Sequence, residues 1–546
     1  MIIGLDVGGT NIDIVAIENN KVVDYKKFEL GDDILSSVLT SLQKFITADY
    51  TPILNRIILS TTITTNAIVQ NKLDKVGMII ENGIGANPDF LMCADANVMV
   101  DGYINNRGIE VKGFSHDTVE KAISEFKKLS IKHVGIACKF SVRNPKHENE
   151  IYEIVKKHGF EFISKGHRIS GKLNFPRRVF STYLNSAVYS SFKLLYNAIS
   201  EFLKEKNLPP EIAFIQKPDG GIINLDSLKE FPIFSILSGP AASAQGGYIL
   251  SKPLSNAVII DIGGTTTDIS FVCNGQFVLE QYGATIGRYP TLVRAIYSRS
   301  VGIGGDSLVK LEDHISVGPE TVKPFATERE NIVTFSDVLL YMKNLSCFDC
   351  KLQARLINLS KKVNMPPLHF CNEVLETALS LICKKIKEGI EYINSAPIYT
   401  IQKLLYGEKF EPEKAIVIGG AADLIAEHLA KRLKIKVEVP KYYMVANAIG
   451  CALGSLSREY NLVADTEQGI VYIPELNRYE SVDIDFSIAQ AKNFLIENII
   501  EAGDAISVDE IEIIEENSFN MIRNFKYCGK IIRLKAQLKP KLQQLE

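Results

Sequence analysis

One nine-residue motif occurs twice in this chain of 546 residues. The sequence Asp-Val-Gly-Gly-Thr-Asn-Ile-Asp-Ile at residues 6–14 recurs as Asp-Ile-Gly-Gly-Thr-Thr-Thr-Asp-Ile at residues 261–269. Each copy follows a short apolar stretch and precedes two more, which an asparagine-containing turn separates. Apolar stretches divided by turn residues in this way are typical of β-hairpins. The sequence therefore predicts an internal duplication built on two β-hairpins with the same polar, glycine-rich tip.

The residues of these tips are suited to binding phosphate. A glycine pair tolerates left-handed backbone conformations and lets backbone N–H groups approach an anion closely. Threonine hydroxyls and an asparagine amide add uncharged donors. Either tip alone is also consistent with an ordinary tight turn, but the matched pair favours one phosphate site with two sides. The predicted phosphate-binding residues are Gly8, Gly9, Thr10, Asn11, Gly263, Gly264, Thr265 and Thr266.

An aspartate stands on each side of the glycine pair in both copies of the motif. Asp6 and Asp261 lie at the end of the first strand of each hairpin. A carboxylate there would repel a phosphate in direct contact, but it can hold Mg²⁺ through water or orient the attacking group. We expect Asp261 to be the more nearly catalytic of the two, and Asp13 and Asp268 to brace the hairpins. The chain contains neither a P-loop nor a Rossmann fingerprint.

Bulk properties exclude several classes of protein. A chain of this length should form two to four domains. The formal net charge of −3 does not indicate a nucleic-acid surface. The N-terminus has no leader pattern, and no apolar run approaches the roughly 18–20 residues that span a bilayer. Nine cysteines, an odd number, do not resemble a secreted disulfide framework. We therefore expect a soluble cytoplasmic protein that binds neither nucleic acid nor membrane.

Strand and helix patterns alternate through most of the chain, which indicates an α/β fold. One long helix is predicted from Phe180 to Lys206. Beyond Glu459 the pattern changes to that of a small α+β region.

Two polar segments lie beside predicted strands. Ala415 to Ile418 reads as a buried strand, and Gly419, Gly420 and Asp423 follow it at the start of an amphipathic helix. Bare glycine backbone there would let the flat ring of adenosine pack closely, although the same pattern is common in ordinary α/β connections. Thr61, Thr62, Thr65 and Asn66 follow another strand. They form either a solvated loop or helix cap, or part of a substrate site beside the terminal phosphate.

Six ordered motifs resemble the hydantoinase/oxoprolinase family, A-subunit type, of the actin-like ATPase superfamily. The resemblance covers about residues 1–455. Residues 60–67 are similar to G-T-T-x-A-T-N-A, residues 144–148 to N-P-x-H-E and residues 237–241 to L-S-G-P-A. The other three similar stretches are residues 4–10, 261–268 and 300–307. The chain departs from the pattern at residues 299–302, where the family has H-T-I-G, and at residues 70–73, where it has E-R-K-G.

The resemblance implies a fold of duplicated actin-like ATPase (ribonuclease H-like) domains with a C-terminal appendage. The expected parts are residues 1–180, residues 181–456 and a small α+β region at residues 457–546. The implied activity is the ATP-dependent opening of a cyclic amide, such as a lactam, hydantoin or 5-oxoproline, by phosphorylation of the amide oxygen. ATP and Mg²⁺, the latter organised by Asp6 and Asp261, are the implied cofactors.

A B-type partner subunit, a homo-oligomer, or both, would complete the assembly that the resemblance implies. The same fold also admits a small-molecule kinase, an ATPase that remodels a protein partner, or a subunit of an ATP-dependent ketone carboxylase.

Four residues form a candidate zinc site. Cys347, Cys350, His369 and Cys371 give a C-x-x-C and an H-x-C pair, which is compatible with tetrahedral Zn²⁺. The alternative is a set of reduced cysteines in the protein core.

Overall fold

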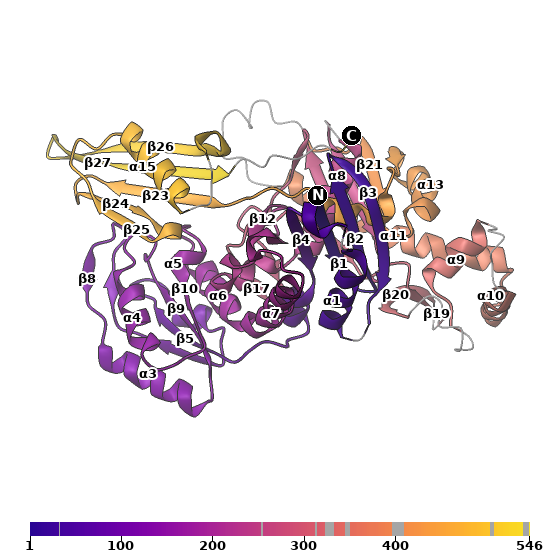
Figure 1. Cartoon of the computed structure of the whole chain (residues 1–546), viewed down its shortest axis with the longest axis horizontal. Helices are drawn as coiled ribbons and strands as arrows, with labels where there is room; N and C mark the ends of the chain where they lie inside the picture. The colour runs from indigo at the N-terminus through magenta and orange to yellow at the C-terminus, as the bar shows by residue number, and fades with distance from the viewer. Residues whose placement is uncertain are drawn as a thin grey trace.

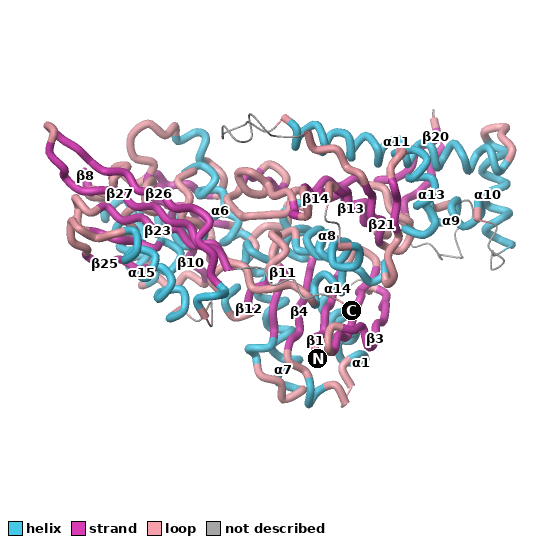
Figure 2. The backbone as a smooth tube through the Cα atoms, turned by 90° about the horizontal axis from the view of Figure 1, so that it is seen from above, coloured by secondary structure: helices cyan, strands magenta, loops and turns pink. Residues whose placement is uncertain are grey.

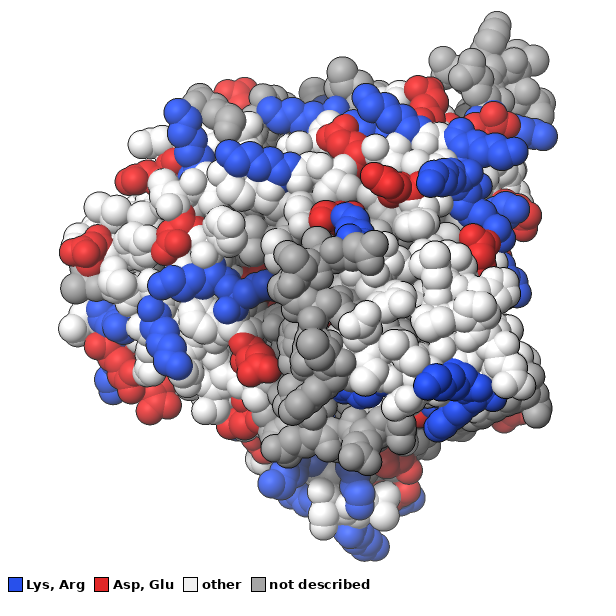
Figure 3. Space-filling view, turned by 90° about the vertical axis from the view of Figure 1, so that its right-hand side faces the viewer, with Lys and Arg blue, Asp and Glu red and all other residues white. Residues whose placement is uncertain are grey.

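A computed structural model describes the chain except residues 32, 48, 253–254, 312–313, 323–331, 344–349, 396–408, 503–506, 539–544 and 546. The molecule is elongated, with two large sheets at one end and two smaller domains at the other (Figure 1). On the face that Figure 3 presents, the described acidic and basic side chains are interspersed.

The first sheet has the strand order β12-β11-β4-β1-β2-β3. Its strands are β1 (Ile2–Val7), β2 (Asn11–Glu18), β3 (Lys21–Glu29), β4 (Arg56–Thr61), β11 (Ala213–Gln216) and β12 (Ile222–Asn224). β1, β2 and β3 form an antiparallel meander, whereas β4 runs parallel to both β1 and β11. Helices α1 (Ile34–Phe45) and α7 (Tyr189–Glu205) contribute to the core on one face, and α14 (Ala446–Ala452) to the core on the other. Because helices cover both faces, β1 is buried along nearly its whole length.

The second sheet repeats this arrangement. Its strand order is β15-β14-β13-β21-β22, and β18 pairs with the outer side of β14. The strands are β13 (Ala257–Ile262), β14 (Thr267–Cys273), β15 (Gln276–Phe277), β18 (Ser298–Val301), β21 (Lys414–Ile418) and β22 (Lys436–Glu438). The meander, the parallel fourth strand and the fifth strand occupy the same places as in the first sheet. The predicted duplicated actin-like fold is therefore confirmed.

Two helices cross between the sheets, α8 (Ser238–Ser251) and α14 (Figure 2). A Cβ at Gly246 of α8 would lie 1.9 Å from the carbonyl oxygen of Ala446, and one at Gly450 of α14 would lie 2.1 Å from that of Ala242. Only glycine permits this approach of two helix backbones. The crossing holds the ends of the two first strands, β1 and β13, close together.

A separate domain is inserted between β4 and β11. Its parallel sheet has the order β10-β9-β5-β6. The elements are α2 (Ile63–Val69), β5 (Val76–Glu81), β6 (Ala96–Met99), α3 (His116–Lys128), β9 (His133–Cys138), α4 (Lys146–Lys156), β10 (Phe162–Lys165), α5 (Gly166–Ile169) and α6 (Phe175–Ala187).

The predicted helix from Phe180 to Lys206 is two helices, because α6 ends at Ala187 and α7 begins at Tyr189. α6 packs on the inserted sheet and α7 on the first sheet. The break at Val188 lets the chain change direction between these two cores. Since β11 and β12 belong to the first sheet, that sheet continues beyond residue 180. The division at residues 180 and 456 stays a prediction.

The C-terminal region is a five-stranded antiparallel sheet with the order β25-β24-β23-β27-β26. Its strands are β23 (Glu459–Asp465), β24 (Ile470–Ile473), β25 (Arg478–Ser481), β26 (Ile511–Arg523) and β27 (Lys526–Leu538). Helix α15 (Ile488–Glu501) packs on one face and completes a core of its own. This agrees with a small α+β region after Glu459.

The remaining strands and α-helices range from two to 28 residues in length. They are β7 (Tyr103–Ile104), β8 (Glu110–Lys112), β16 (Thr285–Ile286), β17 (Tyr289–Pro290), β19 (Ser307–Leu311), β20 (Ile315–Thr321), α9 (Phe335–Met342), α10 (Cys350–Lys362), α11 (Pro367–Asn394) and α13 (Ala422–Leu433). α11 and α13 cover one face of the second sheet. In the part of the chain that is described, no helix combines the length and apolar character needed to cross a bilayer.

Candidate functional site

The two hairpin tips meet each other directly. A Cβ at Gly9 would lie 2.9 Å from Thr265 Oγ1, and one at Gly264 would lie 2.3 Å from Thr10 Oγ1. Gly9 and Gly264 are equivalent positions of the repeated motif, as are Thr10 and Thr265. The contact is therefore reciprocal, as in an interface with two-fold symmetry. Glycine is required at both positions because any side chain would push the tips apart.

A cleft of about 520 Å³ lies between the tips and the strands that carry them. Such a volume lies within the range of roughly 300–1,000 Å³ that is common for small-molecule sites. The predicted residues that line it are Asp6, Gly8, Gly9, Thr10, Asn11, Thr62, Asn66, Asp261, Gly263, Gly264, Thr265, Thr266, Gly419 and Gly420. Tertiary structure thus brings both motifs, the Gly419-Gly420 segment and part of the threonine-rich segment into one place.

The two leading aspartates lie at the floor of this cleft, and one amide joins them. Asn447 Nδ2 donates hydrogen bonds to Asp6 Oδ2 at 3.2 Å and to Asp261 Oδ2 at 3.0 Å. The Ser60 hydroxyl donates to Asp6, and the Ser243 hydroxyl donates to Asp261 Oδ2 at 2.6 Å. Asn447 comes from α14 and Ser243 from α8. The crossing helices therefore fix the positions of the two carboxylates relative to each other.

Burial makes ionisation of these carboxyl groups costly. Loss of hydration raises the pKa of Asp6 to about 7, although its hydrogen bond from Ser60 opposes the shift. Burial and the nearby Asp261 charge raise the pKa of Asp268 to about 7 as well, and burial raises that of Asp261. Asp261 Oδ1 is buried and, among the described residues, has no hydrogen-bond partner. The floor of the cleft is suited to a bound cation, which would favour the ionised carboxylates.

The cleft has a strong excess of acidic side chains over basic ones. Five carboxylates line it, and Lys27 is the single lysine or arginine among the described residues that do so. Lys27 Nζ extends from β3 to Asp13, at 2.7 and 2.8 Å from the two carboxylate oxygens, and to the carbonyl oxygen of Met444 at 2.9 Å. No described lysine or arginine forms an ion pair with Asp268, the equivalent of Asp13 in the second hairpin. The two sides of the site are therefore chemically different.

A glycine-rich loop, residues 302–307, forms a further wall. The backbone N–H of Gly305 donates to Gly263 O at 2.9 Å, and that of Asp306 donates to Gly264 O at 2.7 Å. A Cβ at Gly304 would lie 2.4 Å from Gly264 O, so the loop packs backbone to backbone on the second tip. The Asp306 carboxylate faces the cleft, where burial raises its pKa and a hydrogen bond from Thr10 opposes the shift.

Three predicted site residues do not line the cleft. Ser238 Oγ bonds to the backbone N–H and C=O of Thr61 at 2.9 and 2.8 Å, and Leu237 N donates to Thr65 Oγ1 at 2.8 Å. Thr61 and Thr65 thus connect the segment around α2 to the start of α8. The side chains of this segment that line the cleft are those of Thr62 and Asn66. Asp423 lies on the exposed side of α13, and its carboxylate is 3.2 Å from Lys343 Nζ.

Two of the candidate zinc ligands, His369 and Cys371, do not come together. His369 is exposed, whereas Cys371 is fully buried in the apolar core, where burial raises its pKa to about 12. Residues two apart on a helix face different directions, so these side chains on α11 do not converge on one ion. Cys347 lies outside the described residues, and the side chain of Cys350 is not described. Among the described residues, no group of three or more His, Cys, Asp or Glu side chains is placed to hold a metal.

Sequence reasoning missed five residues of this site. Lys27 carried no recognisable pattern, and Ser60 is the first residue of the 60–67 motif, where the family pattern has glycine. Asn447 was signalled by one polar residue within a helix of small residues. Ser243 follows the residues 237–241 motif in the same helix. Asp306 lies in the glycine-rich segment that resembles the family pattern. The missed residues are Lys27, Ser60, Ser243, Asp306 and Asn447.

Comparison with known proteins gives consistent matches along the chain. A model of the hydantoinase/oxoprolinase family matches residues 178–460, and a model of that family's N-terminal region matches residues 2–159. Caprolactamase subunit alpha from Pseudomonas jessenii is 24% identical over 499 residues, which cover 83% of this chain and 70% of that protein. Acetophenone carboxylase gamma subunit from Aromatoleum aromaticum is 20% identical over 583 residues, with 95% and 77% covered. 5-Oxoprolinase from Saccharomyces cerevisiae is 28% identical over 227 residues, but the match covers 39% of this chain and 17% of that protein.

Two solved structures share the fold over the whole chain. ATP-dependent caprolactamase from Pseudomonas jessenii superposes with a TM-score of 0.72 at 18% identity, and covers 100% of this chain and 88% of that one. Nucleotide-free acetone carboxylase superposes with a TM-score of 0.70 at 16% identity, with 99% and 88% covered.

Proposed function

The chain belongs to the hydantoinase/oxoprolinase family, and from this membership we propose that it is an ATP-dependent enzyme that phosphorylates the oxygen of a cyclic amide so that the ring can be opened. The observation that carries the proposal is the reciprocal contact of two glycine-rich tips above a linked pair of buried aspartates. Two sets of backbone N–H groups facing one space suit the terminal phosphates of a nucleotide.

The nucleotide would lie along the cleft. Gly8, Gly9 and their equivalents Gly263 and Gly264 would bind the β- and γ-phosphates from opposite sides. Gly419 has a φ of +92°, and a Cβ at Gly420 would meet nothing within 4 Å, so bare backbone is available for the adenosine. The N-terminal N–H groups of α13 follow directly and add donors at that end.

The donor set fits Mg²⁺ held mainly through water. Mg²⁺ retains several waters and binds proteins through one or two carboxylates together with substrate phosphates. Asp6 and Asp261 provide such a pair, and the unpartnered Oδ1 of Asp261 provides an acceptor for a water. Mg²⁺ would neutralise charge on the phosphates. Such a site does not need protein side chains for all of its ligands, as a structural metal site does.

In the proposed reaction, the amide oxygen attacks the γ-phosphorus while the bond from that phosphorus to the ADP oxygen breaks, and ADP leaves with the electron pair. Water then adds to the activated carbon, the C–N bond breaks, and the nitrogen takes up a proton, which leaves an acyl phosphate. A second water cleaves this acyl phosphate and releases phosphate and the carboxylate. Thr62 and Asn66 line the cleft on the side of the inserted domain and would position the amide. Asp261 would orient the reacting groups, and Asn447 would fix its distance from Asp6.

We further propose that a B-type partner subunit completes the hydrolytic half of the reaction. Two relatives, caprolactamase subunit alpha and acetophenone carboxylase gamma subunit, are named as subunits of larger enzymes. The second relative also supports an alternative, the ATP-dependent activation of a ketone for carboxylation, because its match covers 95% of this chain. In both reactions, ATP would phosphorylate a carbonyl oxygen of the substrate.

The test is phosphate release from ATP and Mg²⁺ by the pure chain, with lactams, hydantoins, 5-oxoproline and ketones, each with and without the product of a neighbouring gene. We expect one substrate class to stimulate release. Asp261→Asn should reduce the stimulated rate by about 10²- to 10³-fold, in the range of other positioned groups. Asp485→Asn, at an exposed position, should leave it unchanged.

Two outcomes would contradict the proposal. Accumulation of a stable phosphorylated product would indicate a small-molecule kinase. ATP turnover that ignores every small substrate and rises with a protein partner would indicate a remodelling ATPase.

A further inference from the structure

The first hairpin carries a cation of its own, and among the described residues the second hairpin does not. In the first hairpin, β3 lies beside β2 and pairs Lys27 with Asp13. In the second hairpin, β18 takes the corresponding place beside β14 and pairs Ser300 with Asp268. Asp13 and Asp268 are equivalent positions of the repeated motif, so Lys27 and Ser300 are equivalent as well. An ammonium group in one half is therefore replaced by a hydroxyl group in the other.

The Lys27 ammonium group is held by three acceptors. Its Nζ donates to the two carboxylate oxygens of Asp13 at 2.7 and 2.8 Å, and to the carbonyl oxygen of Met444 at 2.9 Å. A lysine ammonium has three N–H groups, so all of its donors are in use. In this arrangement Lys27 neutralises the first hairpin and has no donor left for a phosphate.

The acceptors around Lys27 have counterparts in the second half of the molecule. Helices α8 and α14 are equivalent, because a Cβ at Gly246 of α8 would clash with α14 and a Cβ at Gly450 of α14 would clash with α8. Pro240 precedes Gly246 by as many residues as Met444 precedes Gly450, and Pro240 also lines the cleft. The Pro240 carbonyl group is thus the counterpart of the Met444 carbonyl group. The second half repeats the carboxylate and the carbonyl of the Lys27 site, but it has a hydroxyl where the first half has the ammonium.

An unpartnered acceptor lies next to Asp268. Asp261 pairs with Asp268 across β13 and β14, and both residues line the cleft. Asp261 is only 6% exposed, and its buried Oδ1 has no hydrogen-bond partner among the described residues. Two neighbouring carboxylates repel each other unless a cation lies near both. Carboxylate, carbonyl and hydroxyl oxygens, the last from Ser300 beside Asp268, are the groups that Mg²⁺ prefers in proteins.

We propose that Lys27 is a positioning residue that keeps metal out of the first hairpin, so that the Mg²⁺ ion near Asp6 and Asp261 is drawn toward Asp268 of the second hairpin. The repeated motif would otherwise offer one ion two equal places. An ammonium that already balances Asp13 repels a second cation there, whereas Asp268 has no such neighbour among the described residues. The inference rests on the proposed function, which supplies the nucleotide and its Mg²⁺.

Two variants at equivalent positions, Asp268→Asn and Asp13→Asn, form a matched pair. The probe is Mn²⁺ without nucleotide, because Mn²⁺ prefers the same oxygen ligands as Mg²⁺ and its free form can be counted by electron paramagnetic resonance. We expect the parent chain to bind one Mn²⁺ ion. Asp268→Asn should weaken this binding at least about tenfold, as is usual for the loss of a group around a metal, and Asp13→Asn should change it less than about twofold.

Exchanging the cation between the two halves gives a second test. Lys27→Met leaves Asp13 without its ammonium, so a second Mn²⁺ ion should bind. Ser300→Lys introduces an ammonium beside Asp268, at an exposed position that can accept a long side chain, and should abolish binding. The double variant Lys27→Met/Ser300→Lys should bind one ion again. In that background Asp13→Asn, and no longer Asp268→Asn, should weaken binding.

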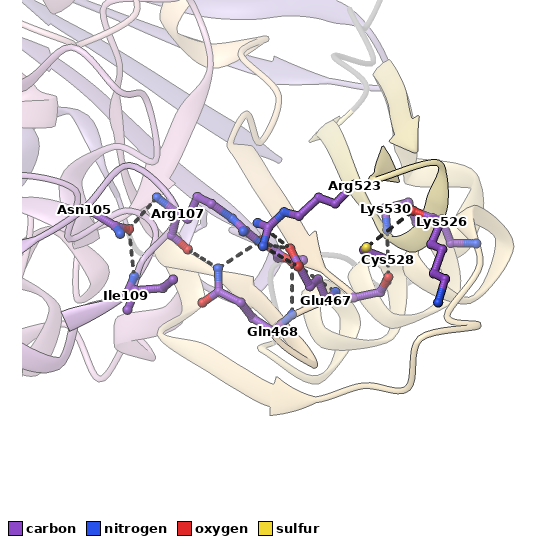
Figure 4. Close-up of polar contacts among 11 residues, drawn as sticks. Asn105, Arg107, Ile109, Glu467, Gln468, Arg523, Lys526, Cys528 and Lys530 are labelled. Carbon is purple, nitrogen blue, oxygen red and sulfur yellow. Dashed lines mark hydrogen bonds and ion pairs between the residues drawn. The ribbon is translucent and has the colours of Figure 1, made fainter. Parts of the chain in front are cut away.

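An ion pair outside the cleft controls for general effects of charge. Arg107 of the inserted domain lies 2.6 Å from Glu467 Oε2, and Arg523 Nη1 lies 3.1 Å from Glu467 Oε1 (Figure 4). These three residues join the inserted domain to the C-terminal region, and they do not line the cleft. Glu467→Gln removes a carboxylate from an ion pair, as Asp268→Asn and Asp13→Asn remove theirs, and should leave the number and affinity of bound Mn²⁺ ions unchanged. Thermal melting shows whether each variant is folded.

Three results would overturn the inference. Equal weakening by Asp13→Asn and Asp268→Asn would mean that the two halves hold the ion alike. A Lys27→Met chain that binds a single ion and loses affinity for ATP in the absence of metal would identify Lys27 as a phosphate ligand. A parent chain that binds no Mn²⁺ alone would remove the site. The proposed function is judged separately, by phosphate release that a substrate stimulates.

Discussion

The titration of Asp6 gives the sharpest test of the cleft. Asp6 is 5% exposed, and burial raises its pKa from 3.8 to about 7. The folded chain therefore holds this proton more tightly than the unfolded chain between those two values. Stability contributed by protonated Asp6 is present at low pH and is lost as pH rises through 7. At pH 5, two units below the folded pKa, this contribution is about 2.7 kcal/mol larger than at pH 9, since one unit corresponds to about 1.36 kcal/mol.

Asp6→Asn removes the titration and should keep the contacts. The Asn447 amide can donate to the new carbonyl oxygen, and the Ser60 hydroxyl can accept from the new amide. We therefore expect the free energy of unfolding of the parent chain to fall by about 3 kcal/mol more than that of the variant between pH 5 and pH 9.

The measurement is urea denaturation at several pH values, followed by circular dichroism because the chain has no tryptophan. Asp485→Asn at an exposed position should keep the pH profile of the parent. The infrared band of a protonated carboxyl, taken as the difference between parent and Asp6→Asn, should titrate near pH 7. Parallel profiles for parent and variant, or a carboxyl band that disappears near pH 4, would refute the reasoning.

Two further predictions concern the cation and the helix crossing. Because a cation at Asp6 competes with its proton, the affinity for Mg²⁺ and ATP should rise about tenfold from pH 6 to pH 8 with release of protons, and calorimetry in two buffers checks this. An affinity that does not change with pH would contradict it. Gly246→Ala places a Cβ 1.9 Å from the Ala446 oxygen and should destabilise the chain by about 1–3 kcal/mol in thermal melting. Gly239→Ala in the same helix has its nearest contact at 3.7 Å and should be neutral, so equal losses in the two variants would remove the argument.

Much of the secondary structure could be predicted from the sequence because it depends on short local patterns of residues. Apolar stretches divided by turn residues predicted the strands of both hairpins, and an amphipathic pattern predicted the helix α13 after Gly419 and Gly420. The continuous helix from Phe180 to Lys206 was wrong. Its helical signal does not change at Val188, and the break arises only because the two halves pack on different sheets.

The site also combines features that local sequence predicts with features that depend on tertiary packing. The glycine and threonine residues of the two tips line the cleft as their pattern predicted. Thr61, the last residue of β4, and Thr65, on α2, do not, since the direction of a side chain depends on how its strand or helix packs. Lys27 could not be recognised, because a lysine on a strand acquires meaning only when Asp13 lies beside it. The roles assigned to these residues stay proposals until the variants are measured.

The sequence by itself determined that two glycine-rich hairpins exist and that their chemistry suits phosphate, because turn geometry and hydrogen-bonding groups belong to a few adjacent residues. Only the tertiary structure decided that the tips touch, that Asn447 links Asp6 to Asp261, and that the cleft holds an excess of buried carboxylates. Those features depend on the close crossing of α8 and α14, which joins segments about 200 residues apart through contacts that no local pattern encodes.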